Sequence, residues 1–349
     1  MTRNTAVSIQ GEKFLINNAP TYQGRTWKGH TIEGLLINTR MVQATFDDLN
    51  PATRHHWVYP DTGVWDPDRN TSEFLANMPV YRDHGVLGFT VNLQGGSPYG
   101  YSQIDEQIWH NSGVTAQGDL RPEYLVRMAR VIERADELGM VTILGIYYFG
   151  QERHMADEAA IKRGVENTID WVLEQGYNNV LIEIDNECNI IYRQPILRPE
   201  RVHELIDLAK SRSKEGRRLL VGVSYGGNHV PLSNVVKSSD FLLMHGNSVE
   251  DPRRIEEMVQ QARQVEGYRP MPILFNEDDH FHFNRPANNF TAAVSQYASW
   301  GFFDYRMKDE GFDEGYQSVP VNWGLSSERK RGFFTLAKEI TGYARQSTV

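Results

Sequence analysis

The feature of this sequence that most limits its fold is a regular alternation of short apolar runs with longer amphipathic stretches. Eight runs rich in β-branched and aromatic residues are predicted as strands, at 34–37, 86–92, 141–148, 180–186, 219–225, 241–245, 272–275 and 300–305. Strands that alternate with helices pair in parallel, because each crossover helix returns the chain to the same end of the sheet.

The stretches between the strands carry helix signals. Helices are expected at 71–83, 122–138, 157–175, from 199, from 252, at 289–299 and at 327–340. Eight short parallel strands favour a closed barrel over an open doubly wound sheet, and the chain has neither a Gly-x-Gly-x-x-Gly motif after the first strand nor a phosphate-binding P-loop. We predict an α/β fold of the (β/α)8 TIM barrel class, as one domain over residues 1–349 with an N-terminal β-hairpin at residues 7–20.

Charge and apolar patterning exclude several kinds of partner. The net charge is -9 and the basic residues form no cluster beyond 329–331, which argues against nucleic acid. No apolar run reaches the roughly 18 residues of a membrane helix. The single cysteine, Cys188, suits a reducing compartment, and a small buried thiol is favoured over a nucleophile there. Because the N-terminus lacks the apolar core of a signal peptide, we expect a cytoplasmic protein.

Two glutamates stand at the ends of predicted strands. Glu187 follows the fourth strand in Ile-Asp-Asn-Glu, and Glu277 follows the seventh in Leu-Phe-Asn-Glu. The carboxyl ends of barrel strands form the active site, and strands four and seven lie across the ring from each other. Two neighbouring carboxyl groups cannot both ionise easily, so one can act as an acid and the other as a nucleophile. The alternative is that both glutamates pair with arginines at the rim.

These strand ends resemble those of the clan A glycoside hydrolases, which are retaining barrel enzymes that include cellulases and mannanases. The resemblance implies that Glu187 is the acid/base, that Asn186 binds the sugar 2-hydroxyl and that Glu277 is the nucleophile. It also implies that His245 hydrogen-bonds the nucleophile and that Trp300 forms the floor of a sugar subsite.

The chain departs from the clan pattern in three places. Cys188 replaces the usual proline after Asn-Glu, and Asp278-Asp279-His280 follows the nucleophile position. The arginine usual at the end of strand two is missing, and Arg40 after strand one is the residue that can take its place. Arg40 can equally form a structural ion pair with Asp47.

Further polar and aromatic residues near the strand ends are candidates for contact with a sugar. Five of them can hydrogen-bond hydroxyl groups if the barrel forms: Asn92, Gln94, Tyr147, Tyr148 and Asn247. Trp323 is a candidate sugar platform, although packing is an equally good reading. Asp279 and His280, with Asp278 and His282, either hydrogen-bond near the nucleophile or hold a metal ion.

The sequence thus predicts an enzyme, a retaining β-glycoside hydrolase that cleaves an oligosaccharide or a small glycoside by double displacement at Glu187 and Glu277. We expect a carbohydrate substrate, no nucleic acid or membrane as a partner, no cofactor and no metal; the oligomeric state stays open. Two alternatives stay open. One is a metal-dependent sugar isomerase or epimerase with Glu187, Glu277, Asp279 and His280 as ligands, and the other is a catalytically inactive carbohydrate-binding barrel.

Overall fold

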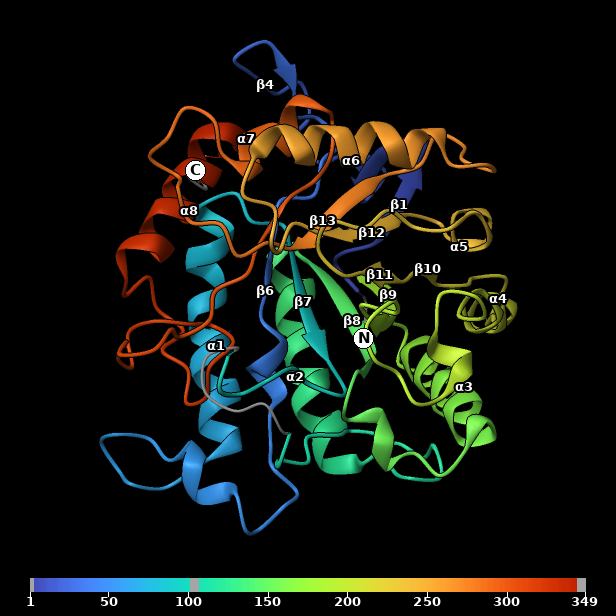
Figure 1. The fold of residues 1–349 in the computed structure, drawn as a ribbon, viewed down its shortest axis with the longest axis vertical. Helices are drawn as coiled ribbons and strands as arrows, with labels where there is room; N and C mark the ends of the chain where they lie inside the picture. Colours follow the sequence, from blue (N-terminus) through green and yellow to red (C-terminus); the bar gives the residue numbers. More distant parts are fainter. Residues whose placement is uncertain (1–2, 101–106, 344–349) are drawn as a thin grey trace.

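The computed structural model describes residues 3–100 and 107–343. The chain begins with a hairpin of β1 (Val7–Gln10) and β2 (Lys13–Ile16), which pair antiparallel, and β3 (Ala19–Pro20) adds a third strand. Gly11 supplies the positive φ of 58° that the tight turn needs. A second small pair, β4 (Thr26–Trp27) and β5 (His30–Thr31), projects from the edge of the molecule (Figure 1).

The next strands form two parallel sheets that together make a closed ring. In chain order they are β6 (Asn38–Arg40), β7 (Gly88–Asn92), β8 (Val141–Tyr148), β9 (Val180–Asn186), β10 (Leu220–Gly222), β11 (Ser224–Tyr225), β12 (Leu242–His245), β13 (Ile273–Glu277) and β14 (Gly301–Phe302). The first sheet has the order β10-β9-β8-β7-β6-β14, and the second has the order β11-β12-β13.

Two connections close the ring. β10 and β11 are successive pieces of one strand, and a parallel bridge from Leu274 to Ser299 joins β13 to the segment that leads into β14. The described residues therefore contain eight strand positions around one barrel, and the predicted (β/α)8 class is confirmed.

Helices surround the strands (Figure 1). They are α1 (Pro67–Asp83), α2 (Pro122–Leu138), α3 (Glu158–Glu174), α4 (His203–Ser211), α5 (Ser233–Ser238), α6 (Pro252–Gln264), α7 (Asn289–Ser295) and α8 (Glu328–Thr341), with short 3-10 turns η1 (Val42–Thr45), η2 (Arg54–Trp57), η3 (Glu152–His154) and η4 (Pro195–Leu197). No helix within the described ranges has the length and apolar character needed to cross a membrane.

Some boundaries differ from the predicted ones. The first barrel strand pairs at Asn38–Arg40 instead of 34–37, because the Leu36 amide donates to the Ser299 hydroxyl instead of to a neighbouring strand. Helix α1 begins early, at Pro67, because Asp66 caps it. The helix expected from residue 199 begins at His203 instead.

The side chains inside the barrel change from apolar to polar along the barrel axis. Its N-terminal end is an apolar layer that Phe14 of the hairpin closes, together with Leu36, Leu87, Val141, Ile143, Leu181, Phe241, Leu243 and Leu274. Further along the same strands the inward positions are polar, and they include Asn38, Arg40, Glu183 and Asn276. Because strand side chains alternate between the two faces, this polar column leads directly to the carboxyl ends of the strands.

Candidate active site

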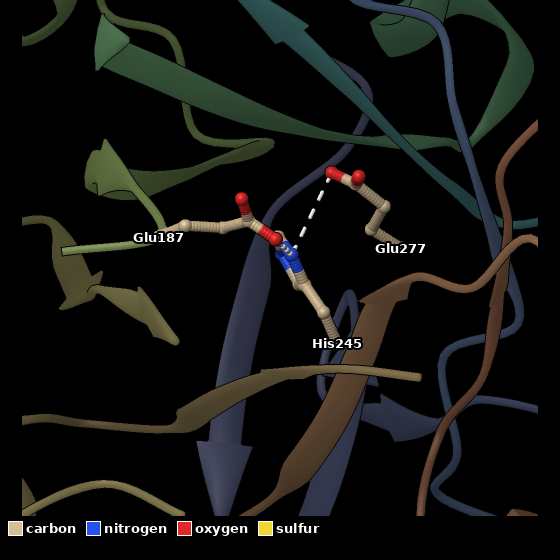
Figure 2. Close-up of side chains that lie close together, drawn as sticks. All are labelled: Glu187, His245 and Glu277. Carbon is tan, nitrogen blue, oxygen red and sulfur yellow. Dashed lines mark hydrogen bonds and ion pairs between the residues drawn. The ribbon is translucent and has the colours of Figure 1, made fainter. Parts of the chain in front are cut away.

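Glu187 and Glu277 face each other at the carboxyl end of the barrel, and His245 lies between them (Figure 2). His245 Nδ1 is 2.8 Å from Glu187 Oε1 and 3.6 Å from Glu277 Oε2, so its hydrogen bond is to Glu187, which corrects the expected bond to Glu277. One donor atom from each of the three side chains lies within 4.8 Å of the others. Only 7% of Glu187 and 1% of Glu277 is exposed, so both carboxyl groups are buried.

Two groups hold the Glu277 carboxylate in place. Arg40 Nε lies 2.7 Å from Oε2, and Asn247 Nδ2 donates to Oε1 at 2.7 Å. These contacts favour the charged form of Glu277, because both partners are donors. A carboxylate that is fixed and charged before substrate arrives is suited to nucleophilic attack.

Arg40 connects Glu277 to residues of β9. Its NH2 group donates to Asn186 Oδ1 at 2.5 Å, and its NH1 group lies 3.8 Å from Glu183 Oε2. Glu183 is held in turn by Asn276 Nδ2 at 3.2 Å. The guanidinium thus sits between two buried carboxylates, which offsets the cost of placing its charge inside the barrel.

The backbone at Glu187 explains why proline is absent from the next position. Glu187 has a φ of 57°, and its amide donates to the Ser224 hydroxyl at 2.9 Å. The Cys188 amide donates to the Ser224 carbonyl at 3.0 Å. A proline at 188 would remove that donor and disfavour the helical conformations, including the left-handed one, at Glu187. The Cys188 amide therefore helps to hold the backbone conformation that orients the Glu187 side chain.

The carboxylates change the acidity of the groups around them. Burial lowers the pKa of His245, but the charges of Glu277 and Glu187 and the hydrogen bond to Glu187 outweigh it, so that the pKa is raised. Tyr148 ends β8 beside the same pair, and burial followed by the charges of Glu277 and Glu187 raises its pKa. Tyr148 is therefore a neutral hydroxyl.

A second polar cluster follows Glu277. Asp278 accepts from the Trp300 indole at 2.9 Å and lies 2.8 Å from His280 Nδ1. Burial opposes the charge of His280, but the hydrogen bond and charge of Asp278, with Asp279 and Glu250, raise its pKa to about 9. Burial and the charge of Asp278 raise the pKa of Asp279 to about 6.

The structure brings together seven of the residues proposed from sequence and shows a packing role for others. The seven around the carboxylate pair are Arg40, Tyr148, Asn186, Glu187, His245, Asn247 and Glu277. Asp279 stands next to them, and its electrostatic contacts include Glu277. Asn92 lies inside the barrel, where a methyl group at Gly145 would approach its Oδ1 to 2.2 Å.

Four of the expected sugar contacts have other partners in the structure; this corrects the prediction for Trp300, Tyr147 and Gln94 and agrees with the packing alternative for Trp323. Trp300 is fully buried and stacks on Phe290 at 4.8 Å between ring centroids. Trp323 is likewise buried, and its indole donates to Asn70. Neither ring has a face free for a sugar.

The other two corrections concern hydrogen bonds that are already made. The Tyr147 hydroxyl donates to the Ile161 carbonyl of α3, so its side chain points towards the helices. The Gln94 amide group bonds Ser112 and accepts from the Tyr148 amide, so it supports the backbone beside the site. Tyr147 and Tyr148 are neighbours on β8, so the ordinary alternation of a strand points them to opposite faces.

Three residues of the site were not singled out from sequence. Glu183 lies four positions before Glu187, and inward alternation along the strand was the signal that could have found it. Asn276 directly precedes Glu277 and supports Glu183. Ser224 had no sequence signal, because its role depends on the approach of two strands.

The candidate metal ligands fall into separate groups. Among the described residues, Glu187, His245 and Glu277 form one group with donor atoms within 4.8 Å, and Asp278, Asp279 and His280 form another. The four ligands of the isomerase alternative are divided between these groups. The Arg40 contact to Glu277 and the His280 contact to Asp278 also occupy atoms that such a metal centre would need.

The alternative role proposed for Arg40 was an ion pair with Asp47, and the pairs made among the described residues are different ones. Asp47 pairs with Arg54 at 2.9 Å, whereas Arg40 contacts Glu277 inside the barrel. The expected pairing of a site glutamate with an arginine does occur, but it is buried at the centre and not at the rim.

Fold and site together define a (β/α)8 barrel with two facing glutamates at the carboxyl ends of its fourth and seventh strand positions. No known protein family and no curated protein sequence matches the chain. Solved structures with this fold do match.

The similar structures include several glycoside hydrolases. One is a putative glycoside hydrolase from Bacteroides vulgatus, with 10% identity and a TM-score of 0.57; the match covers 94% of this chain and 60% of that chain. A second is a beta-glucosidase from Thermotoga maritima in complex with deoxynojirimycin, with 10% identity, a TM-score of 0.56, and coverage of 89% and 99%. A third is a family 5 enzyme from Prevotella bryantii, with 11% identity, a TM-score of 0.53, and coverage of 88% and 95%. These similarities establish the fold.

Proposed function

We propose that this chain is a retaining β-glycoside hydrolase acting on a short oligosaccharide or small glycoside. The observation that carries the proposal is the approach of the Glu187 and Glu277 oxygens to within 4.8 Å. Retaining enzymes place their two carboxyl groups about 5 to 5.5 Å apart, whereas inverting enzymes need about 6.5 to 9.5 Å to admit a water molecule. The near-complete burial of Glu277 favours substrates whose sugar end enters a closed pocket.

In the first step, a Glu277 oxygen bonds to the anomeric carbon while the glycosidic bond breaks. Glu187 gives its proton to the leaving oxygen, and its new charge then accepts a hydrogen bond from His245 Nδ1. In the second step, Glu187 takes a proton from water, the water oxygen bonds to the anomeric carbon, and Glu277 leaves as a carboxylate. The stereochemistry at carbon is inverted twice and therefore retained.

Three buried polar atoms support sugar binding at this centre. Asn186 Nδ2, Asn247 Oδ1 and His245 Nε2 have no hydrogen-bond partner among the described residues. A buried polar atom without a partner costs free energy, which sugar hydroxyl groups could offset. Asn186 already accepts from Arg40 through Oδ1, so its Nδ2 is the atom that can donate to a hydroxyl.

The test is a panel of 4-nitrophenyl β-glycosides, with the anomer of the first product followed by NMR. We expect the β-anomer first, a loss of about 100-fold or more in kcat for Glu187→Gln and a larger loss for Glu277→Gln. The surface variant Glu174→Gln is the matched control, because it makes the same change on the exposed end of α3.

A 2-deoxy-2-fluoro glycoside should label the peptide that contains Glu277, and activity should survive chelation. An α-anomer as first product, normal turnover by Glu277→Gln, or loss of activity with a chelator would each contradict the proposal. A protein that hydrolyses no glycoside but still binds sugars would support the inactive barrel instead.

A further inference from the structure

Exposed aliphatic side chains lie on two neighbouring loops, one of which begins directly after Glu187. Six large apolar side chains are exposed among the described residues, and three of them lie on the loops that follow β9 and β11: Ile190, Ile191 and Leu232. Ile191 is 83% exposed, only four positions after Glu187. The other three, Val64, Val80 and Val126, are on separate parts of α1, α2 and the loop before α1. We call Ile190, Ile191 and Leu232 the mouth patch.

Contacts between the two loops hold the mouth patch together. The Gly226 amide donates to Asn189 Oδ1 at 2.7 Å, and a methyl group at Gly226 would lie 3.0 Å from Ile190 Cδ1. The Leu232 amide donates to the Tyr225 hydroxyl at 3.2 Å. Tyr225 in turn interacts with the Cys188 thiol, directly after Glu187. Both loops are therefore tied to Cys188 and Asn189, which directly follow Glu187.

The position of the mouth patch relates it to one part of a substrate. The residue that protonates the leaving oxygen must face the aglycone, which is the group that departs with that oxygen. The Glu187 side of the centre is also the less buried side. Resting on the proposed function, we infer that the mouth patch is an aglycone subsite and that the substrates are β-glycosides with an apolar alkyl or aryl aglycone.

The chemistry of the patch argues against two other occupants. A second sugar presents hydroxyl groups on its edges, and aliphatic side chains would leave those hydroxyls without partners. A second copy of the chain needs an interface of about 800 Å² on each partner, which three side chains do not supply. An apolar group matches the polarity of the patch.

The first experiment uses methyl, butyl and octyl β-glycosides of each sugar in the panel. Alkyl leaving groups differ little in reactivity, so differences in kcat/KM report contacts with the chain. A methylene that becomes half buried is worth about a twofold gain, so kcat/KM should rise about eightfold from methyl to butyl. A flat series in the wild type would overturn the inference while leaving the proposed function intact.

The variant Ile191→Asn combined with Leu232→Asn should remove most of this chain-length dependence. In the double variant, the ratio of kcat/KM for the butyl glycoside to kcat/KM for the methyl glycoside should fall from about eight to between about one and two, whatever the change in overall activity. Val126→Asn is the matched control, since Val126 is exposed on α2. A double variant that retains the full dependence would count against the mouth patch.

The second experiment does not depend on turnover. Protein labelled with ¹³C at Ile, Leu and Val methyl groups is titrated with 4-nitrophenol, and the methyl signals of the mouth patch should shift while Val126 does not. Binding without hydrolysis of any glycoside would leave the apolar site standing and reject the proposed function. No shift, or a shift caused by raising the protein concentration alone, would overturn the inference.

Discussion

The residue types that position 188 tolerates depend on the backbone conformation of the neighbouring Glu187. Its thiol is buried, yet the structural need at this position is an amide hydrogen: Cys188 donates to Ser224, and Glu187 stands at a positive φ. A non-glycine residue in this conformation stores strain, which functional sites often carry. The thiol itself is therefore less important than the fact that the residue is not proline.

We predict that Cys188→Pro lowers kcat at least about 100-fold and destabilises the fold by about 3 kcal/mol, because it removes a donor and disfavours the Glu187 conformation. Cys188→Ala should keep kcat within a few-fold. Turnover of an aryl glycoside and urea unfolding measure the two effects. Equal behaviour of the two variants would reject this account of Cys188.

The raised pKa of His280 predicts how the stability of the fold depends on pH. Its folded pKa of about 9 lies above the ordinary value of 6.5. The folded state therefore binds the proton more tightly, and the stabilisation is complete below about pH 6.5 and lost as pH rises through 9.

We expect His280→Gln to cost about 2 kcal/mol near pH 6, with allowance for partial exposure, and almost nothing above pH 9. Urea unfolding across this range gives the difference, and the exposed His282→Gln is the control. A cost that did not change with pH would mean that packing, and not the charge on His280, stabilises the cluster.

Helix ends were predicted well where a local signal exists. Helix α2 begins at Pro122 and ends before Gly139, whose φ is 68°, as its sequence predicts. The predicted start of α4, at residue 199, was wrong. Residues 199–202 form turns before the helix begins, although their apolar pattern looks helical. Local caps define a boundary, whereas periodicity alone does not.

The residue that caps helix α7 is followed directly by a residue that contacts the polar cluster after Glu277. The Asn288 side chain accepts from the Thr291 amide, and the Thr291 hydroxyl accepts from the Asn288 amide. The next residue, Asn289, donates to Asp278 at 3.3 Å. We predict that Asn288→Ala costs about 1 kcal/mol in urea unfolding, while Asn288→Asp retains the cap and most of the stability. Identical losses in both variants would show that the cap is not what stabilises α7.

At the scale of the molecule, the hairpin closes the end of the barrel opposite the site. Phe14 is fully buried and packs against Phe241 with ring centroids 6.2 Å apart. We predict that Phe14→Ala lowers the free energy of unfolding by about 3 to 5 kcal/mol through the cavity that it leaves. The kcat of the Phe14→Ala variant, measured at a temperature where the variant stays folded, should differ from the wild-type value by less than twofold.

Phe14→Leu is the control, since it keeps most of the buried volume. Kinetics and urea midpoints measured on the same preparations separate the two effects. A large loss of kcat in a folded Phe14→Ala variant would show that the two ends of the barrel are coupled.

The sequence by itself determined the alternation of strands and helices, and with it the positions of Glu187 and Glu277 at two strand ends. These are local properties, because periodicity, caps and strand ends depend on residues close together in the chain. The same local pattern misplaced Trp300 and Tyr147, whose directions depend on neighbouring strands and helices.

Only the tertiary structure decided how the two glutamates are held. Arg40, Glu183 and Asn276 come from three strands and meet inside the barrel, so no spacing along the chain reveals their contacts. The left-handed turn at Glu187 likewise depends on Ser224 of the neighbouring strand. Closure of the ring brings these distant residues together, and burial there requires each charge to find a partner that only the folded chain supplies.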